Sequence, residues 1–250
     1  MKLRLKYGMC CLAMVALLGF STTSCIEAEK DIPDLEYAYT PATMTVTCES
    51  MMEYAYANGS INAYPVVSGG TVVLKALMTP YNVTFPEIIW LSSDETIATV
   101  SYPEDNLATV QGTDGVTNNG TVTAVGSVGE STNITARPPM EVSGLTTVQI
   151  PVTVRIVSSL TRTTSITLNS EAETLSVGDT FVATATASAG AIYGNEVLWS
   201  TSDASVATVS GGTITAKAAG SATISASSLD GSLTGSSVSG SIVITVEAAE

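Results

Sequence analysis

Few side chains in this 250-residue chain could do chemistry, because the sequence contains no histidine. That absence removes the Ser-His-Asp and Cys-His catalytic arrangements and every histidine-based metal site. The tight carboxylate groupings are short and lie in polar segments: Asp94-Glu95, Glu104-Asp105 and Glu171 with Glu173. Adjacent carboxylates of this kind are usually solvated, whereas a glycosidase needs two carboxyl groups about 5 to 9.5 Å apart across a cleft. We therefore predict that the protein is not an enzyme.

The charge balance excludes another class of partner. The sequence has 9 Lys and Arg against 23 Asp and Glu, so its formal charge is −14 and its pI is near 4.2. A chain this acidic has no basic surface for nucleic acid. No cofactor is predicted, although the oxygen ligands present leave open a calcium site at a loop end or at a domain junction.

The N-terminus has the pattern of an export signal. Basic residues Lys2, Arg4 and Lys6 precede an apolar run over 9–20. That run of about twelve residues is shorter than the roughly 20 needed to span a bilayer. A basic start, a short apolar run and small residues before a cleavage site are typical of a secretory signal peptide, here predicted over 1–24.

The end of this segment carries a second signal. The sequence STTSC over 21–25 resembles the lipobox of bacterial lipoproteins, in which the cysteine is acylated and becomes the mature N-terminus. Thr22 stands where many lipoboxes carry Leu, as in the looser lipoboxes of Bacteroidota. We predict that Cys25 is lipidated, which anchors the protein to a membrane. The alternative is ordinary signal-peptidase cleavage, which would leave a soluble secreted protein.

The mature chain begins with an acidic tether and holds a single thiol. Residues 25–41 are acidic, contain proline and show no periodicity, so they read as a solvated tether. Cys10 and Cys11 leave with the signal peptide, and only Cys48 remains once Cys25 is acylated. Any folded domain must therefore be stabilised by its apolar core alone, without an internal disulfide.

An internal repeat defines the domain organisation. Residues 90–100 (WLSSDETIATV) recur as 199–209 (WSTSDASVATV), and 69–73 (GGTVV) align with 178–182 (GDTFV) at the same offset of 109 residues. A constant offset across separate motifs indicates two copies of one domain. Further matches follow in the same order: GTVTA over 120–124 with GTITA over 212–216, and NITA over 133–136 with TISA over 223–226.

Each copy reads as a series of short strands. Runs of β-branched residues alternate with polar ones and are separated by Gly, Ser, Asn, Asp and Pro, which is typical of an antiparallel sandwich. The predicted fold is all-β, with two tandem immunoglobulin-like antiparallel β-sandwiches. The predicted boundaries are 42–157 for the first domain, 158–164 for the linker and 165–250 for the second domain.

The repeated motifs also resemble a known family. A Gly-x-Thr strand, a WxSSDxxIATV segment, a Gly-x-Val-Thr-Ala strand and a final Ile-Thr-Ala strand are similar to bacterial immunoglobulin-like domains of group 2, the modules of intimin- and invasin-type adhesins. The resemblance covers about 66–157 and 166–247. It implies a module at the cell surface whose members serve as spacers, adhesive tips or accessory domains.

Both copies supply candidates for the core. Trp90 and Trp199 stand late in a predicted strand, and each would bury on the order of 200 Å² between the sheets. Val100 and Val209 follow at the end of the repeated motif, where the chain re-enters the core. These four residues are the predicted structural core of the two domains.

The first copy carries two insertions, at about 50–65 and 101–119. Asn58-Gly59 in the earlier insertion predicts a hairpin turn. Tyrosines on a rigid hairpin are good surfaces for sugar stacking or protein contact. The candidate ligand-binding residues are Tyr54, Tyr56, Tyr64 and Tyr102. The alternative is that the hairpin lies against the sandwich and buries them.

These observations predict an exported, outer-membrane lipoprotein of the bacterial cell envelope. It would present Ig-like modules at the cell surface for adhesion or for contact with a protein or a glycan. A glycan-binding accessory lipoprotein of a polysaccharide-uptake system and a structural spacer or assembly subunit are the alternatives. The periplasmic face of the membrane also remains open.

Overall fold

The structure is a computed structural model that describes residues 43–79, 87–103, 109–110, 116–138 and 148–248. All of them belong to one compact unit, Tyr39–Glu250. The signal peptide over 1–24, Cys25 and the tether over 25–41 lie outside the described residues, as does part of the insertion at 101–119.

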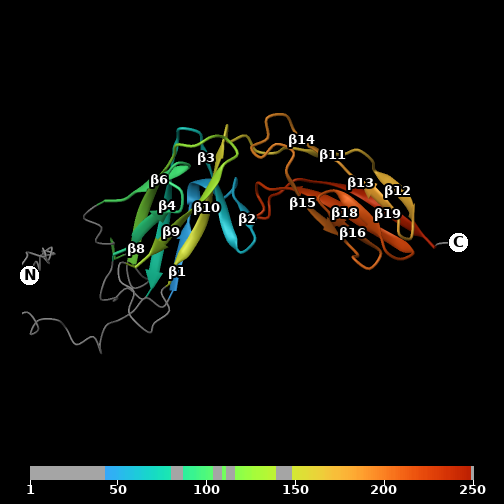
Figure 1. Ribbon diagram of the computed structural model, residues 1–250, viewed down its shortest axis with the longest axis horizontal. Helices are drawn as coiled ribbons and strands as arrows, with labels where there is room; N and C mark the ends of the chain where they lie inside the picture. The colour runs from blue at the N-terminus through green and yellow to red at the C-terminus, as the bar shows by residue number, and fades with distance from the viewer. Residues whose placement is uncertain (1–42, 80–86, 104–108, 111–115, 139–147, 249–250) are drawn as a thin grey trace, which may run out of the picture. The chain divides into compact units, whose positions relative to one another are not determined.

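The described residues confirm the all-β prediction. Apart from a single 3-10 turn, η3 (Glu49–Met51), every regular element among them is a strand. No helix in this part of the chain is long and apolar enough to cross a membrane. Figure 1 colours the strands by their position in the sequence: those up to residue 157 run from blue to yellow, and those after it run from orange to red.

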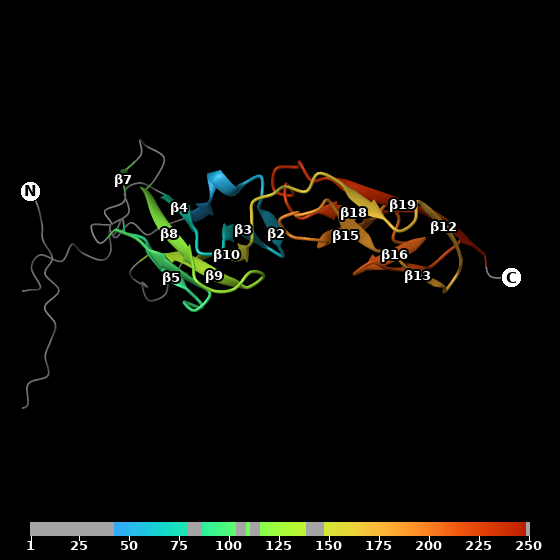
Figure 2. The same cartoon turned by 90° about the horizontal axis from the view of Figure 1, so that it is seen from above.

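The strands of the first sandwich form two sheets. They are β1 (Thr43–Thr47), β2 (Tyr56–Asn58), β3 (Ile61–Val67), β4 (Thr71–Thr79), β5 (Ile89–Ser92), β6 (Ala98–Ser101), β7 (Thr109–Val110), β8 (Val116–Ala124), β9 (Ser131–Arg137) and β10 (Ile150–Val157). One sheet has the order β1-β4-β8-β6, with β7 also paired to β8, and the other has the order β2-β3-β10-β9-β5. All pairs are antiparallel except β3 with β10. Figure 2 shows the two layers, with β4 and β8 in one and β9 and β10 in the other.

The core of the first sandwich follows from alternation along its strands. β4 and β9 bury every second residue, so those side chains point between the sheets. Leu74, Ile134 and Ile156 are fully buried there, and the ring of Trp90 is 2% exposed. Val100 is partly buried and packs against the same cluster. Fully burying a large apolar side chain stabilises the fold by about 1.5–3 kcal/mol.

The second sandwich repeats the strand order of the first. Its strands are β11 (Ile166–Leu168), β12 (Ala172–Ser176), β13 (Thr180–Val182), β14 (Ala185–Ala187), β15 (Val197–Thr201), β16 (Ala207–Ser210), β17 (Thr213–Ala216), β18 (Gly220–Ser228) and β19 (Ser239–Glu247). The order β12-β19-β18-β15 corresponds to β3-β10-β9-β5, including the parallel pair at one side. The opposite layer consists of β13-β17-β16 and β11-β14. There, the two short strands β13 and β14 take the place of the continuous β4.

The second core is smaller and more open around its tryptophan. Ile214, Ile224 and Ile242 are fully buried. Trp199 and Val209 are partly buried and pack against this cluster. The indole of the second copy is therefore less completely enclosed than that of the first.

Candidate functional site

The predicted hairpin of the first insertion forms, with a turn one residue later than expected. β2 and β3 pair antiparallel with Asn58 opposite Ile61, so Gly59 and Ser60 make the turn. Gly59 has φ +64°, a left-handed conformation that favours glycine. Met52 and Tyr54 precede β2 in a turn that follows η3.

The structure does not bring the four candidate tyrosines together at the surface. Tyr64 is fully buried in the core of the first sandwich, and burial raises the pKa of its hydroxyl. Tyr56 is 9% exposed, and Tyr54 packs beside it. Tyr56 and Tyr64 are therefore enclosed, and Tyr54 is partly buried. Tyr102 is 37% exposed and follows β6, in the other sheet.

The hairpin tyrosines are covered by residues of the second half of the chain. We call this group the junction cluster; its buried members are Tyr56, Ala63, Val157, Ile192, Tyr193 and Leu229. The rings of Tyr56 and Tyr193 meet edge to face, with centroids 4.9 Å apart at 76°. The hydroxyl of Tyr193 donates to the carbonyl oxygen of Tyr54 at 2.7 Å. Sequence periodicity did not reveal this cluster, because its members are far apart in the chain.

An ion pair lies beside the junction cluster. The guanidinium of Arg155 on β10 donates to both carboxylate oxygens of Glu196, including a 2.8 Å bond from Nη1 to Oε2. It also lies 5.4 Å from the ring centroid of Tyr193, a cation–π distance. The hydrogen bonds from Arg155 lower the pKa of Glu196. Because the pair is bidentate, its geometry is more specific and its hydrogen bonds are stronger than those of a pair with a single hydrogen bond.

Residues of the predicted linker, 158–164, make hydrogen bonds and apolar contacts with the folded part of the chain. The buried Thr163 donates from its backbone N–H and its hydroxyl to the two carboxylate oxygens of Asp230, at 2.9 and 2.6 Å. Asp230 is itself fully buried, and Arg162 lies 3.6 Å from it. Leu160 packs on the junction cluster. The segment between the sandwiches is thus fixed by hydrogen bonds and apolar contact.

The repeated SSD and TSD motifs form the same turn in both sandwiches. Asp94 Oδ1 accepts from the backbone N–H and the hydroxyl of Thr96, at 2.9 and 2.6 Å. Asp203 accepts from Ser205 in the same way, at 2.8 and 2.5 Å. These bonds lower the pKa of both aspartates, so both are ionised at neutral pH. Within the described part of the chain, no three acidic or cysteine side chains are grouped as a metal site.

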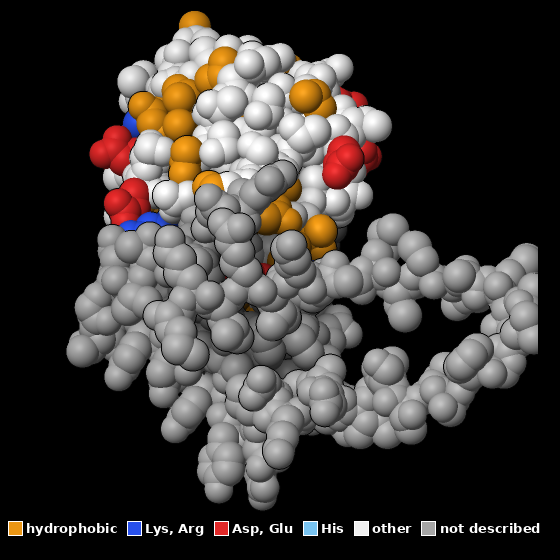
Figure 3. Space-filling model, turned by 90° about the vertical axis from the view of Figure 1, so that its left-hand side faces the viewer, with side chains coloured by type: hydrophobic (Ala, Val, Ile, Leu, Met, Phe, Trp, Pro, Cys, Tyr) orange, Lys and Arg blue, Asp and Glu red, His pale blue; other side chains and the backbone are white. Residues whose placement is uncertain are grey.

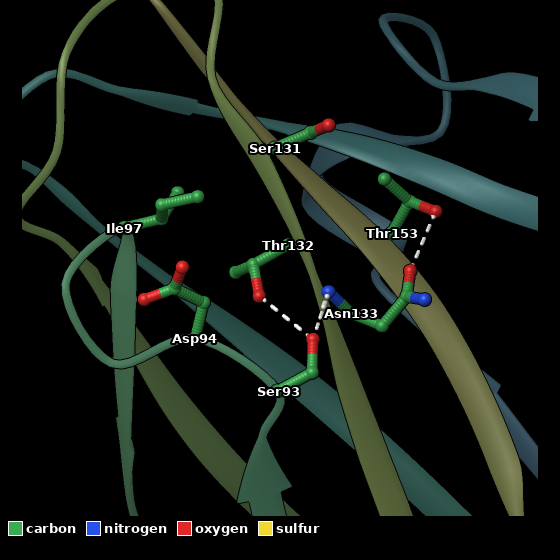
Figure 4. Close-up of a pocket in the computed structure, with 7 residues that line it drawn as sticks. All are labelled: Ser93, Asp94, Ile97, Ser131, Thr132, Asn133 and Thr153. Atoms are coloured by element: carbon green, nitrogen blue, oxygen red, sulfur yellow. Dashed lines mark hydrogen bonds between the residues drawn. The ribbon is translucent and has the colours of Figure 1, made fainter.

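A polar depression lies beside this turn in the first sandwich (Figure 4). Its volume is about 320 Å³, and its lining residues are Ser93, Asp94, Ile97, Ser131, Thr132, Asn133 and Thr153. We call it the β9 pocket, because three of these residues belong to β9. Figure 4 shows Asp94 and Ile97 on one side of β9 and Thr153 on the other. Sequence reasoning missed the pocket because strand pairing, not sequence proximity, brings its residues together.

Charged groups are sparse on the described surface near the first sandwich. On the face drawn in Figure 3, outside its grey area, uncharged polar and backbone atoms prevail and the acidic side chains lie toward the margins. On the same face, hydrophobic side chains are scattered among the uncharged polar and backbone atoms. This distribution fits the low proportion of charged residues in the chain, 13%.

Comparison with a family model bears on the second sandwich. Residues 162–237 match the bacterial Ig-like domain, group 2. This part of the chain is similar to a bacterial Ig-like domain. The sandwich itself continues beyond the match through β19.

Among curated proteins, none matches the chain. Domains 5-6 of the S-layer protein SbsC are 16% identical over 84% of this chain and 99% of that chain, with a TM-score of 0.32. The fibronectin(III)-like modules of Clostridium thermocellum CbhA are 15% identical over 82% of this chain and 95% of that chain, also at 0.32. SbsC domains 1-6 are 19% identical over 85% of this chain and 29% of that chain, at 0.28. The chain thus spans less than a third of this longer protein, and such low scores say nothing about function.

Proposed function

We propose that the protein is a non-enzymatic lipoprotein of the bacterial cell envelope. Cys25 would carry the lipid that anchors it to the outer membrane, and the acidic tether would separate the anchor from the folded part. Two Ig-like sandwiches would then be presented at the cell surface for adhesion or for contact with a protein or a glycan. The observation that carries this proposal is the match of residues 162–237 to the bacterial Ig-like domain.

The first sandwich is proposed to be a module of the same group. The sheet order β3-β10-β9-β5 corresponds to β12-β19-β18-β15 in the second sandwich. The turn hydrogen bonds of Asp94 and Asp203 also correspond, donor for donor. Two copies of one fold with the same turn chemistry support a tandem array of one module type.

The junction supports a role in presentation. A flexible linker would let the second sandwich move independently, whereas here the linker and the hairpin tyrosines are packed and hydrogen-bonded. An ordered connection between modules suits a spacer or an adhesive arm, because it limits the conformational entropy lost when a distant partner binds.

Cell fractionation with acyl labelling tests the anchor. Cells expressing the full chain are fed an alkyne-bearing fatty acid, and the protein is expected in the outer-membrane fraction with the label attached. Cys25→Ser should abolish the label and release the protein from the membrane, while Cys48→Ser, the matched control, should leave both unchanged. Degradation of the wild-type protein by protease added to intact cells would place it on the outer face. A wholly soluble, unlabelled wild-type protein would overturn the proposal.

A further inference from the structure

Each sandwich pairs an early strand in parallel with its last strand. In the first sandwich β3 pairs with β10, and Ala63 lies opposite Thr153. In the second sandwich β12 pairs with β19, and Ala172 lies opposite Val243. Each of these two ladders joins five residue pairs. Figure 1 shows β12 beside β19 in the second sandwich.

The parallel pairing decides how a sandwich resists tension along the chain. Tension draws the early strand toward its N-terminal end and the last strand toward its C-terminal end. Because the two strands run in the same direction, they are pulled in opposite directions along one axis. The ladder hydrogen bonds are evenly spaced between the strands, so sliding the strands apart loads all five pairs together. Strands separated from one end would instead lose their hydrogen bonds one after another.

The ladder of the first sandwich is reinforced. β3 lies between β2 and β10, so it is hydrogen-bonded to a neighbour on both sides. Residues 63–66 of β3 are buried, and the ring of Tyr64 is fully enclosed in the core. Just beyond the ladder, the backbone N–H of Ser68 donates to the carbonyl oxygen of Val157 at 2.9 Å. β2, which belongs to the insertion at about 50–65, thus makes β3 an interior strand.

The corresponding ladder of the second sandwich is weaker. β12 is the edge strand of its sheet, and none of its five residues is buried. Leu175 is partly buried and packs against the core. The bond that corresponds to that of Ser68, from the N–H of Val177 to the carbonyl oxygen of Glu247, measures 3.3 Å and is longer than usual.

The first strands of the two sandwiches differ in the same direction. β1 pairs with β4 over five residues, and its Met44 and Val46 are buried. β11 pairs with β14 over three residues, and only Ile166 of β11 is buried. Both strands that tension loads from the N-terminal side are therefore held by more contacts in the first sandwich than in the second.

We propose that the chain is a tension-bearing arm in which the second sandwich unfolds before the first. The unfolded second sandwich lengthens the arm and limits the force on the anchor, while the first sandwich, reinforced by β2, stays folded. Forced unfolding is governed by the rate of unfolding, so the contacts of the loaded strands set the order. The proposal rests on the proposed function, in which an anchored adhesive protein is pulled by its partner.

Pulling the full chain in optical tweezers, in detergent and with handles at its two ends, tests the order. At about 3.6 Å per residue, unfolding from Thr43 to Val157 releases about 40 nm of chain, and unfolding from Ile166 to Glu247 releases about 30 nm. The shorter step is expected first and at the lower force. A longer step that comes first, or steps without a fixed order, would overturn the proposal.

A second measurement changes only the direction of pulling on the second sandwich. An azide-bearing amino acid replaces Glu171 and Glu247, at opposite ends of the ladder, or Glu171 and Ser241, at the same end. All three positions are exposed, so both variants should keep the fold, which thermal unfolding verifies. Because only the first geometry loads the five pairs together, it should raise the unfolding force about twofold or more.

Equal unfolding forces in the two geometries would show that the parallel ladder does not resist tension, and would overturn the proposal. The two pulling measurements do not depend on the lipid anchor. A protein found soluble and unlabelled in cells would overturn the proposed function, because it removes the source of tension, while the measured order of unfolding would stand.

Discussion

The indole ring of Trp90 lies directly over Gly120, with no room for a side chain between them. A Cβ on Gly120 would lie 2.6 Å from Cδ2 of Trp90. In the second sandwich, a Cβ on Gly212 would lie 2.4 Å from the carbonyl oxygen of Ala183 and 3.3 Å from the ring of Trp199. The glycine that begins the repeated Gly-Thr-x-Thr-Ala motif therefore lies against the repeated tryptophan in both sandwiches.

Gly120→Ala is expected to destabilise the first sandwich, because either the buried indole or the strand must shift to admit a methyl group. Overpacking of this kind costs about 1–3 kcal/mol. Urea titration, which gives the free energy of unfolding, measures this loss of stability. Asn119→Ala, at an exposed neighbouring position, is the control and should change stability by less than about 0.5 kcal/mol. Equal stability of the two variants would show that the ring has room to move.

Tyr193→Phe should weaken the junction while keeping its ring contacts. The change removes the 2.7 Å hydrogen bond to the carbonyl oxygen of Tyr54 and leaves the edge-to-face contact with Tyr56. The expected loss is about 0.5–1.5 kcal/mol. Thermal unfolding followed by calorimetry measures it, and separation into two transitions would show that the junction couples the sandwiches. An unchanged unfolding profile would mean that this hydrogen bond contributes nothing to the coupling.

The ion pair of Arg155 with Glu196 should make stability depend on pH on the acid side. The pKa of Glu196 is lowered from its ordinary value of 4.5, so the folded state favours the carboxylate. The stabilisation that the ion pair contributes is complete above pH 4.5, and it is lost as the pH falls through the lowered pKa of Glu196 in the folded state. Glu196→Gln should flatten the decline in melting temperature below pH 4.5. Glu95→Gln, at an exposed position, should leave the decline as in the wild type.

Cys48 should report the opening of the first sandwich. Its side chain is fully buried, and burial raises the pKa of the thiol, so both access and thiolate fraction are low in the folded state. Modification by a disulfide reagent is expected to be slow in buffer and fast in urea, with a rate that follows the unfolded population. Complete modification within minutes under native conditions would contradict the buried position.

Calcium should not change the stability of the protein. Asp94 and Asp203 already use Oδ1 for hydrogen bonds within their own turns, and no group of three metal-binding side chains occurs among the described residues. The melting temperature is therefore expected to be the same with calcium chloride and with a chelator. A rise of several degrees with calcium would reveal a site elsewhere in the chain.

Local patterns in the sequence determined the class of fold. Alternation of β-branched and polar residues predicts strands, and the offset of 109 residues predicts two copies. The Ser-Asp turn could also be read from the sequence, because its bonds join residues two apart, as from Asp94 to Thr96. These features depend on contacts between near neighbours, and near neighbours are what a sequence displays.

The tertiary structure alone decided which surfaces are covered. The sequence left open whether the hairpin tyrosines form a surface or are buried. In the structure, Ile192 and Tyr193, more than a hundred residues later, bury Tyr56. Arg155 forms an ion pair with Glu196, which is 41 residues away in the sequence. In the β9 pocket, Asn133 is hydrogen-bonded to both Ser93 and Thr153, which strand pairing brings close to it. Such contacts depend on sheet register and on how the sandwiches meet. Periodicity within one strand cannot specify them, because it fixes which residues share a face but not what packs against that face.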